Sequence, residues 1–90
     1  MYNKSNLKIA GGKLISVRCK VKNNKLLDIK ITGDFFLHPE DSIEDLEKHL
    51  NGSNVEHVSG LVNSFFKGAK ISVIGADKDD FVKVILDAVT

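Results

Sequence analysis

Two short segments near the start of the chain alternate between apolar and polar residues. Their apolar positions are Val17, Cys19 and Val21 in the first segment, and Leu27, Ile29 and Ile31 in the second. Successive side chains of a strand point to opposite faces, so a period of two predicts a strand with one buried face. The two segments therefore predict an antiparallel hairpin whose apolar face must be covered by the rest of the chain.

The parity of these two segments also predicts the loop between them. Pairing Val21 with Leu27, and so Cys19 with Ile29, keeps all the apolar positions on one face. That pairing requires an odd number of loop residues, such as residues 23–25. A two-residue asparagine turn would shift the register by one and move one strand's apolar side chains to the other face. We therefore predict a three-residue loop.

The second half of the chain carries apolar residues at helical spacing. We predict three helices, over residues 39–50, 54–68 and 78–89. Pro39 suits the first turn of a helix. Ser53 and Glu56 form a capping-box pattern ahead of the second helix, and Asp77 is the expected cap of the third.

The order of these elements predicts the fold class. Residues 71–74 predict a short strand between the last two helices, whereas the sequence leaves open whether residues 4–9 form another strand. The expected order is β-β-α-α-β-α, and we predict an α+β fold in which a small antiparallel sheet is packed on one face by about three helices. Residues 1–90 suffice for a single domain with a small core, which favours an accessory or binding module over a self-sufficient enzyme.

Charge is segregated along the chain. Residues 1–25 carry seven cationic side chains and no acidic one, whereas residues 34–57 carry seven acidic side chains and one lysine. The balanced total of +1 therefore hides a basic and an acidic segment. This asymmetry predicts either an oriented anionic partner or pairing between the two segments within the molecule.

Few single residues could carry chemistry. Cys19 lies on the inward face of its strand, which predicts a buried thiol, and one cysteine excludes an internal disulfide and fits a reducing cytoplasm. His38, His49 and His57 lack metal-ligand spacing. The lysines do not interleave with aromatic residues as in a nucleic-acid stacking platform, and there is no signal-peptide pattern or membrane-length apolar run. We expect a cytoplasmic protein without a metal, nucleic-acid or membrane partner.

The most informative segment joins the second predicted strand to the first helix and reads Gly33-Asp34-Phe35-Phe36-Leu37-His38-Pro39-Glu40. Gly33 allows a bend or a close backbone approach, and Asp34 can accept hydrogen bonds from turn amides. Neighbouring residues in extended chain face opposite ways, so the alternation predicts Phe35 on the core face and Phe36 pointing outward. A bulge at Gly33 would exchange these two roles.

Upstream, Gly11-Gly12-Lys13 predicts a tight turn, in which Lys13 could contact an acidic partner surface or a nucleotide phosphate. Together with the later segment, this pattern resembles the small C-terminal module of lipoate–protein ligases over residues 8–52. In archaeal bipartite ligases this module is a separate chain of similar size. Ala10 stands where relatives often have proline.

The resemblance implies a division of labour between two chains. A large catalytic subunit would hold lipoate, ATP and Mg²⁺. This chain would bind no cofactor alone, would enable formation of lipoyl-AMP, and would serve lipoyl-acceptor proteins only indirectly. The resemblance supplies no catalytic residue. The positions carried over as partner or adenylation-site contacts are Gly11, Gly12, Lys13, Gly33, Asp34, Phe35, Phe36 and Pro39, and His38 is added because it lies beside Phe36 in the same loop. The alternative is a scaffold of the iron–sulfur or sulfur-transfer type that shares the fold, and the single cysteine counts against it.

Overall fold

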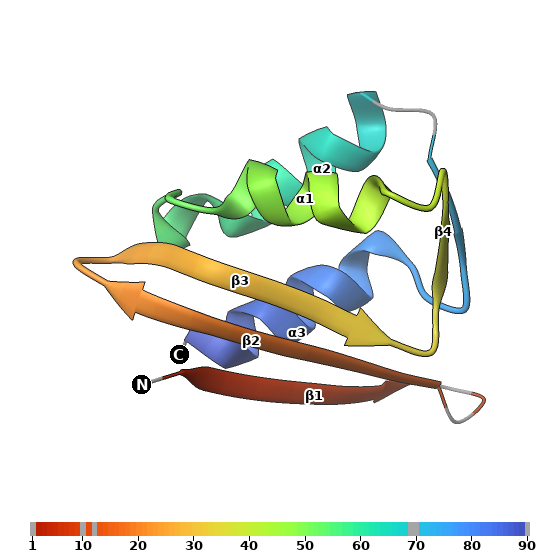
Figure 1. The fold of residues 1–90 in the computed structure, drawn as a ribbon, viewed down its shortest axis with the longest axis horizontal. Helices are drawn as coiled ribbons and strands as arrows, with labels where there is room; N and C mark the ends of the chain where they lie inside the picture. Colours follow the sequence, from red (N-terminus) through yellow and green to blue (C-terminus); the bar gives the residue numbers. More distant parts are fainter. Residues whose placement is uncertain (1, 10, 12, 69–70, 90) are drawn as a thin grey trace.

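The two alternating segments form neighbouring strands of a three-stranded antiparallel sheet (Figure 1). The computed structural model describes residues 2–9, 11, 13–68 and 71–89. The sheet has the order β1-β2-β3, with β1 at Asn3–Ile9, β2 at Lys13–Lys22 and β3 at Lys25–Gly33. The strand that the sequence left open therefore exists as β1, and it pairs with the whole first part of β2.

Short strands and helices make up the remainder. They are β4 (Phe36–His38), α1 (Ser42–Leu50), a 3-10 turn η1 (Val55–His57), α2 (Val58–Gly68), β5 (Ser72–Ile74) and α3 (Lys78–Val89). β4 and β5 pair with each other as a separate antiparallel ribbon. The predicted α+β class and the predicted order of elements are confirmed, with β1 and β4 as additional strands.

The turn between β2 and β3 differs from the prediction. It consists of two residues, Asn23 and Asn24, whose φ angles of 52° and 65° are both positive. Such a pair of left-handed residues matches the twist of a tight hairpin, and asparagine tolerates this conformation well. Val21 therefore pairs with Leu26 and not with Leu27. The predicted three-residue loop was wrong.

A β-bulge then restores the register that the short turn would have lost. The pairing shifts opposite Cys19, where β3 has one residue more than β2, and Asp28 adopts a φ of 51°. Beyond this point Val17 pairs with Ile31, as the alternation predicts. The extra residue moves the later part of β3 back into phase, so Leu26 on one side of the bulge and Ile31 on the other are both buried.

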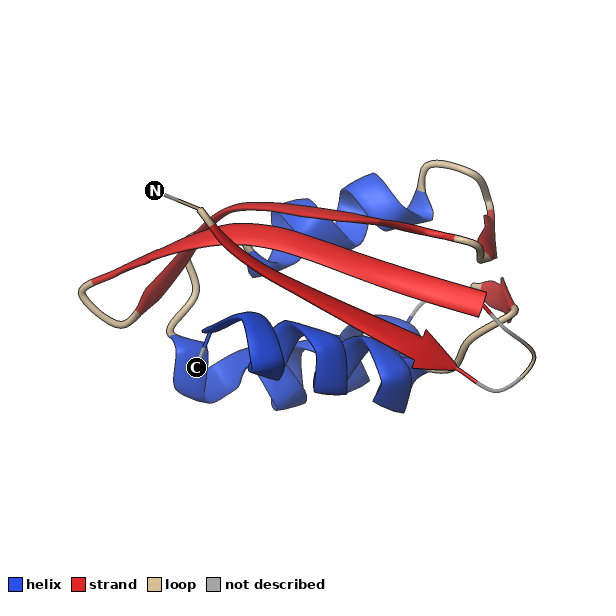
Figure 2. Cartoon of the chain, turned by 90° about the horizontal axis from the view of Figure 1, so that it is seen from below, coloured by secondary structure: helices blue, strands red, loops and turns tan. Residues whose placement is uncertain are grey.

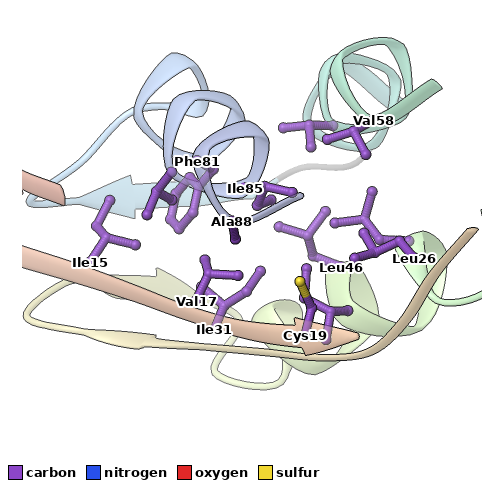
Figure 3. Close-up of a cluster of buried hydrophobic side chains, with 14 of the residues drawn as sticks. Ile15, Val17, Cys19, Leu26, Ile31, Leu46, Val58, Phe81, Ile85 and Ala88 are labelled. Carbon is purple, nitrogen blue, oxygen red and sulfur yellow. The ribbon is translucent and has the colours of Figure 1, made fainter. Parts of the chain in front are cut away.

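The core lies between the inner face of the sheet and α3, which Figure 2 shows lying against one side of the strands. Phe81, Ile85 and Ala88 of α3 point toward the side chains of the sheet (Figure 3). Spacings of three and four residues place these side chains on one face of the helix. Burial of apolar side chains on both sides of this contact is the main stabilising term of the fold. The buried residues in contact include Ile15, Val17, Ile31, Phe81, Val84, Ile85 and Ala88.

Side chains of α1 cover the outer edge of β3. The Ile31 amide donates to Glu47 Oε2 at 2.7 Å, and the Asp28 amide donates to Asn51 Oδ1 at 2.9 Å. Glu47 is 9% exposed, so its hydrogen bond is shielded from water. Residues four apart lie on one side of a helix, which lets one helix supply both acceptors. The edge of β3 is thereby closed to pairing with another strand.

Two of the predicted helix starts are displaced. α2 begins at Val58, after η1, and not at residue 54. α1 begins at Ser42 rather than near Pro39, because the Ser42 amide donates to the Pro39 carbonyl at 3.0 Å in a turn ahead of the helix. The predicted start of α3 is confirmed. The Asp80 amide donates to Asp77 Oδ1 at 3.1 Å, and Asp80 Oδ2 accepts from the Asp77 amide at 3.0 Å.

The predicted capping box at Ser53 is wrong. Its hydroxyl donates to the Leu50 carbonyl at 2.6 Å and so satisfies the end of α1. Asn54 takes the capping role instead, since its side chain accepts from the Glu56 amide at 3.0 Å. A short polar side chain can serve a helix end on either side of it, and tertiary structure decides which.

Removing the Glu47 carboxylate should destabilise the fold. Glu47→Ala leaves the buried Ile31 amide without an acceptor, which costs about 1–3 kcal/mol in the free energy of unfolding. Glu47→Gln keeps an acceptor oxygen and should cost less. Glu44→Ala, on the exposed part of the same helix, should change stability by less than about 0.5 kcal/mol. Urea unfolding of the three variants checks this, and equal losses for Glu44→Ala and Glu47→Ala would contradict it.

Candidate functional site

The candidate site is built around Gly33, the last residue of β3. Gly33 pairs with Ile15, and the next amide, that of Asp34, donates to the Leu14 carbonyl at 2.8 Å. A Cβ atom at Gly33 would collide with the same Leu14 carbonyl oxygen and lie 3.0 Å from the Phe35 ring. Only glycine permits this close approach of β3 to β2. The chain can therefore leave the sheet here and turn into β4.

The two adjacent phenylalanines take the roles that the alternation predicts. Phe35 is half-buried and packs edge-on against Phe81, with ring centroids 5.0 Å apart and planes at 89°. Phe36 is 70% exposed. Leu37, the next residue, is buried again, so the alternation continues without interruption into β4. Edge-on aromatic contacts are favourable beyond their buried area, so Phe35 is a fixed anchor for the segment.

Exposed apolar side chains gather at this end of the molecule. Phe36 pairs across the β4–β5 ribbon with Ile74, which is 65% exposed, and Leu14 at the start of β2 is 39% exposed. We call Leu14, Phe36 and Ile74 the apolar end; it lies where β2 begins and where the β4–β5 ribbon stands (Figure 1). An open hollow of about 290 Å³ beside it is lined by Phe35, Phe36, Leu37, Glu40 and Ile43. Neighbouring exposed apolar residues of this kind are typical of interaction surfaces.

The upstream motif comes to the same end of the fold. Gly11, with a φ of 90°, lies in the turn between β1 and β2, and the exposed Lys13 opens β2. Gly12 lies outside the described residues. Since Leu14 accepts the hydrogen bond from the Asp34 amide, the fold brings the two halves of the motif together although some twenty residues separate them. That these residues contact a partner or the adenylation site stays a prediction.

His38 and Pro39 lie at the far end of β4. His38 is exposed and pairs with Ser72 of β5, and the peptide bond between His38 and Pro39 is cis. Pro39 is exposed too, and its carbonyl accepts the hydrogen bond that leads into α1. These two residues border the β4–β5 ribbon and do not reach the turn at Gly33.

Two residues at the site escaped the sequence analysis. Gly75 has a φ of 95°, and a Cβ atom there would lie 3.1 Å from the Asp34 carbonyl oxygen. Gly75 therefore lets the end of β5 pack against the motif segment. Ile74, next to it, lies in the apolar run 71–74. Whether its side chain is buried or exposed depends on how β5 pairs with β4. The glycine after a short β-rich run was the one available signal.

The residues considered for chemistry do not assemble into a catalytic or metal centre. Cys19 is buried, with its sulfur among apolar side chains (Figure 3). Burial raises the pKa of the Cys19 thiol, so it stays protonated and is a poor metal ligand. His49 packs its ring 5.7 Å from that of Phe65. Across residues 2–9, 11, 13–68 and 71–89, no group of three or more His, Cys, Asp or Glu side chains could hold a metal ion.

Among the described residues, no helix is both long enough and apolar enough to cross a membrane.

Within the part of the chain that the structure describes, ion pairs link Lys20 with Asp28 and Lys30 with Glu47, each at 3.8 Å. Neither pair joins residues 1–25 to residues 34–57. The segregated charge predicted either an anionic partner or pairing between the two segments. These contacts give no support to pairing between the segments.

Comparison with known proteins identifies the family. Residues 2–85 match the family of the bacterial lipoate protein ligase C-terminus. The chain belongs to this family. The chain is also 39% identical over 85 residues to lipoate-protein ligase A subunit 2 of Thermoplasma acidophilum. The aligned region covers 94% of this chain and 87% of that relative.

The fold agrees with this assignment. The chain matches a solved chain from the structural analysis of an archaeal lipoylation system, a bi-partite lipoate protein ligase and its E2 lipoyl domain from Thermoplasma acidophilum. The TM-score is 0.86 and the identity 34%, over 94% of both chains. The resemblance to the lipoate protein ligase C-terminal module, drawn from residues 8–52, is confirmed and extends over nearly the whole length.

The contrast between the two phenylalanines predicts a contrast in stability. Phe35→Ala removes the edge-on contact with Phe81 and should lower the free energy of unfolding by about 3 kcal/mol. Phe36→Ala removes a mostly exposed ring and should change it by less than about 0.5 kcal/mol. Thermal melts of both variants and of the unchanged chain decide the matter. Equal melting temperatures for the two variants would mean that Phe35 is not an anchor.

Proposed function

We propose that this chain is a non-catalytic accessory subunit that associates with the large, catalytic subunit of a lipoate protein ligase and enables formation of lipoyl-AMP. Membership of the lipoate protein ligase C-terminal family supports this proposal. So does the likeness to a ligase chain named as subunit 2. The observation that carries it is the apolar end, where Phe36 of the family motif and its cross-strand neighbour Ile74 are exposed to solvent.

The apolar end is the docking surface in this proposal. Phe36 and Ile74 are cross-strand neighbours, so their side chains form one continuous apolar area. Burial of exposed aromatic and aliphatic side chains is a principal source of affinity at the centre of an interface. Phe35 is held against Phe81, so Phe36 is presented from a fixed backbone and little conformational freedom is lost on binding.

The adenylation chemistry resides on the catalytic subunit. The hollow beside the apolar end is open and not enclosed, and the nearby Lys13 is a single exposed cation. We therefore place the binding of lipoate, ATP and Mg²⁺ on the larger chain. Docking of a rigid module over that site excludes water and holds the reacting groups in position, and both effects favour a condensation such as adenylation. Lys13 stands at the same end and could meet a nucleotide phosphate or an acidic group of the catalytic subunit.

Acceptor proteins meet the catalytic subunit in this proposal, and the accessory chain serves them only indirectly. We place the complex in the cytoplasm. A reducing compartment suits a chain whose single cysteine is a buried, protonated thiol. The position of Cys19 counts against the scaffold alternative, because a thiol enclosed by the core cannot bind an iron–sulfur cluster.

Truncating the apolar end should weaken association with the catalytic subunit. Phe36→Ala and Ile74→Ala should each raise the dissociation constant about 5- to 30-fold, as expected for central interface residues. They should also slow lipoyl-AMP formation at limiting subunit concentration. Lys83→Ala is the control, since Lys83 is an exposed residue of α3 and belongs to neither the motif segment nor β5. Isothermal titration with the catalytic subunit measures the effect, and unchanged affinity for both variants would exclude this docking surface.

The chain alone should not adenylate lipoate. Lipoate-dependent exchange of pyrophosphate into ATP should stay at background with this chain, and should appear when the catalytic subunit is added. The reason is that the described residues bring together no acid–base constellation and no enclosed phosphate site. Exchange by the isolated chain that survives repurification would overturn the accessory role.

A further inference from the structure

One face of the three-stranded sheet is left without a covering layer. Inward-pointing residues of β2 and β3 are buried against the helices, whereas the outward-pointing residues of all three strands are mostly exposed. We call the outward side the open face. Its residues include Lys4, Asn6 and Lys8 of β1, Ser16, Arg18 and Lys20 of β2, and Lys30 and Thr32 of β3.

A row of three cations crosses the open face. Lys4 of β1 lies directly opposite Arg18 of β2, and Arg18 lies directly opposite Lys30 of β3. Neighbouring strands are about 4.8 Å apart, and like charges placed opposite each other destabilise a sheet. The arrangement therefore works against stability unless an anion lies over the row.

A second row beside the cations supplies neutral hydrogen-bonding groups. Asn6 pairs with Ser16, and Ser16 pairs with Thr32, one step along the same strands. The Ser16 hydroxyl donates to Asn6 Oδ1 at 2.7 Å, and the exposed Asn6 and Thr32 add an amide nitrogen and a hydroxyl to this row. The two rows together line a shallow hollow of about 310 Å³ whose lining contains no acidic residue.

The protein itself neutralises little of this charge. Lys30 lies 3.8 Å from Glu47, but that carboxylate also accepts the Ile31 amide and lies at the edge of the sheet. Arg18 is held with its guanidinium 4.8 Å from the centre of the Tyr2 ring, which orients the cation without cancelling its charge. The centre of the row therefore remains positive.

We propose that the open face is a docking surface for an acidic protein surface, and that it is distinct from the apolar end. Carboxylates spread over a partner's surface can pair with a row of cations that spans three strands, and the neutral row can satisfy the remaining hydrogen bonds at its side. Phe36 and Ile74 of the apolar end lie on β4 and β5, whereas Leu14 lies opposite Lys8 and borders the open face. The open face is the exposed side of the sheet, whereas the apolar end lies at the tip where β4 and β5 stand.

The limits of the open face favour a protein over a nucleic acid. Beyond Lys30 the surface is acidic on balance, since the next hollow is lined by three carboxylates, of Asp28, Glu44 and Glu47, against the two lysines Lys30 and Lys48. A long polyphosphate chain that followed the row of cations would be repelled there. Tyr2 is the one aromatic residue beside the row, and its ring already contacts Arg18 and Lys20, so no platform for stacking bases is present on the described face.

The test uses the full chain and a simple acidic polypeptide. With ¹⁵N-labelled protein at low salt, poly-L-glutamate should shift the backbone amide signals of the two rows and leave those of Phe36 and Ile74 in place. The triple variant Lys4→Gln, Arg18→Gln, Lys30→Gln should bind roughly tenfold more weakly, since three exposed charge pairs are lost. Binding should also weaken as salt is raised, because exposed charges are screened over about 10 Å at 0.1 M.

A matched control separates this site from net charge. Lys67→Gln, Lys78→Gln, Lys83→Gln removes the same number of charges from exposed positions on α2 and α3 and should bind within about twofold of the unchanged chain. Equal weakening in both triple variants would overturn the proposal. Tighter binding of single-stranded oligothymidylate or of inorganic phosphate than of poly-L-glutamate, at equal charge concentration, would overturn it as well.

Two further measurements keep the result independent of folding and of the proposed function. If the triple variant does not fold, the single variant Lys4→Glu on the edge strand takes its place and should also weaken poly-L-glutamate binding. Phe36→Ala should leave that binding unchanged, whatever its effect on the catalytic subunit. Loss of poly-L-glutamate binding in Phe36→Ala would show that the two surfaces form one binding site, and would contradict the proposal.

Discussion

The contact between α3 and the inner face of the three-stranded sheet is the interaction on which the rest of the molecule depends. The alternating strands offer one apolar face, and the buried side of α3 covers it. Phe81 lies fully buried in this contact and also packs against Phe35, 5.0 Å away, and Phe66, 5.7 Å away. The hydrophobic contact that stabilises the core therefore also fixes the position of the motif segment and of α2.

The motif end follows from this anchoring. Because Phe35 is held by Phe81 and the following alternation is unbroken, Phe36 must point away from the core. Close approaches at Gly33 and Gly75 bring the segment against β2 and β5, where side chains larger than hydrogen would collide with backbone oxygen atoms or crowd them. The two neighbouring phenylalanines therefore have different roles. One stabilises the fold, and the other is free to contact a partner.

Covering one side of the sheet leaves the other side open, and the cations of the first two strands concentrate there. A domain of 90 residues can bury only a small core, so much of its surface remains available for contacts. In this chain the available surface falls into an apolar part at the tip of the β4–β5 ribbon and a cationic part on the sheet. An accessory module with two chemically different surfaces can contact two partner surfaces and still keep a single rigid core.

The sequence by itself determined the features that depend on local spacing. The period of two placed β2 and β3 and assigned Phe35 inward and Phe36 outward, the helical period placed α2 and α3, and the residues around Gly33 indicated the family. Tertiary structure decided the features that depend on distant partners. The asparagine turn is compatible with the buried face only because β3 bulges at Asp28. Ser53 does not cap the second helix, because its hydroxyl donates to the Leu50 carbonyl at the end of α1. From the sequence, Glu47 is one more acidic residue of a solvated helix, but the structure places it beside the edge of β3, where it accepts the Ile31 amide. The exposure of Ile74 is likewise decided by the pairing of β5 with β4. Local periodicity specifies which way a side chain points along its own element, whereas only the packing of elements specifies what that side chain meets.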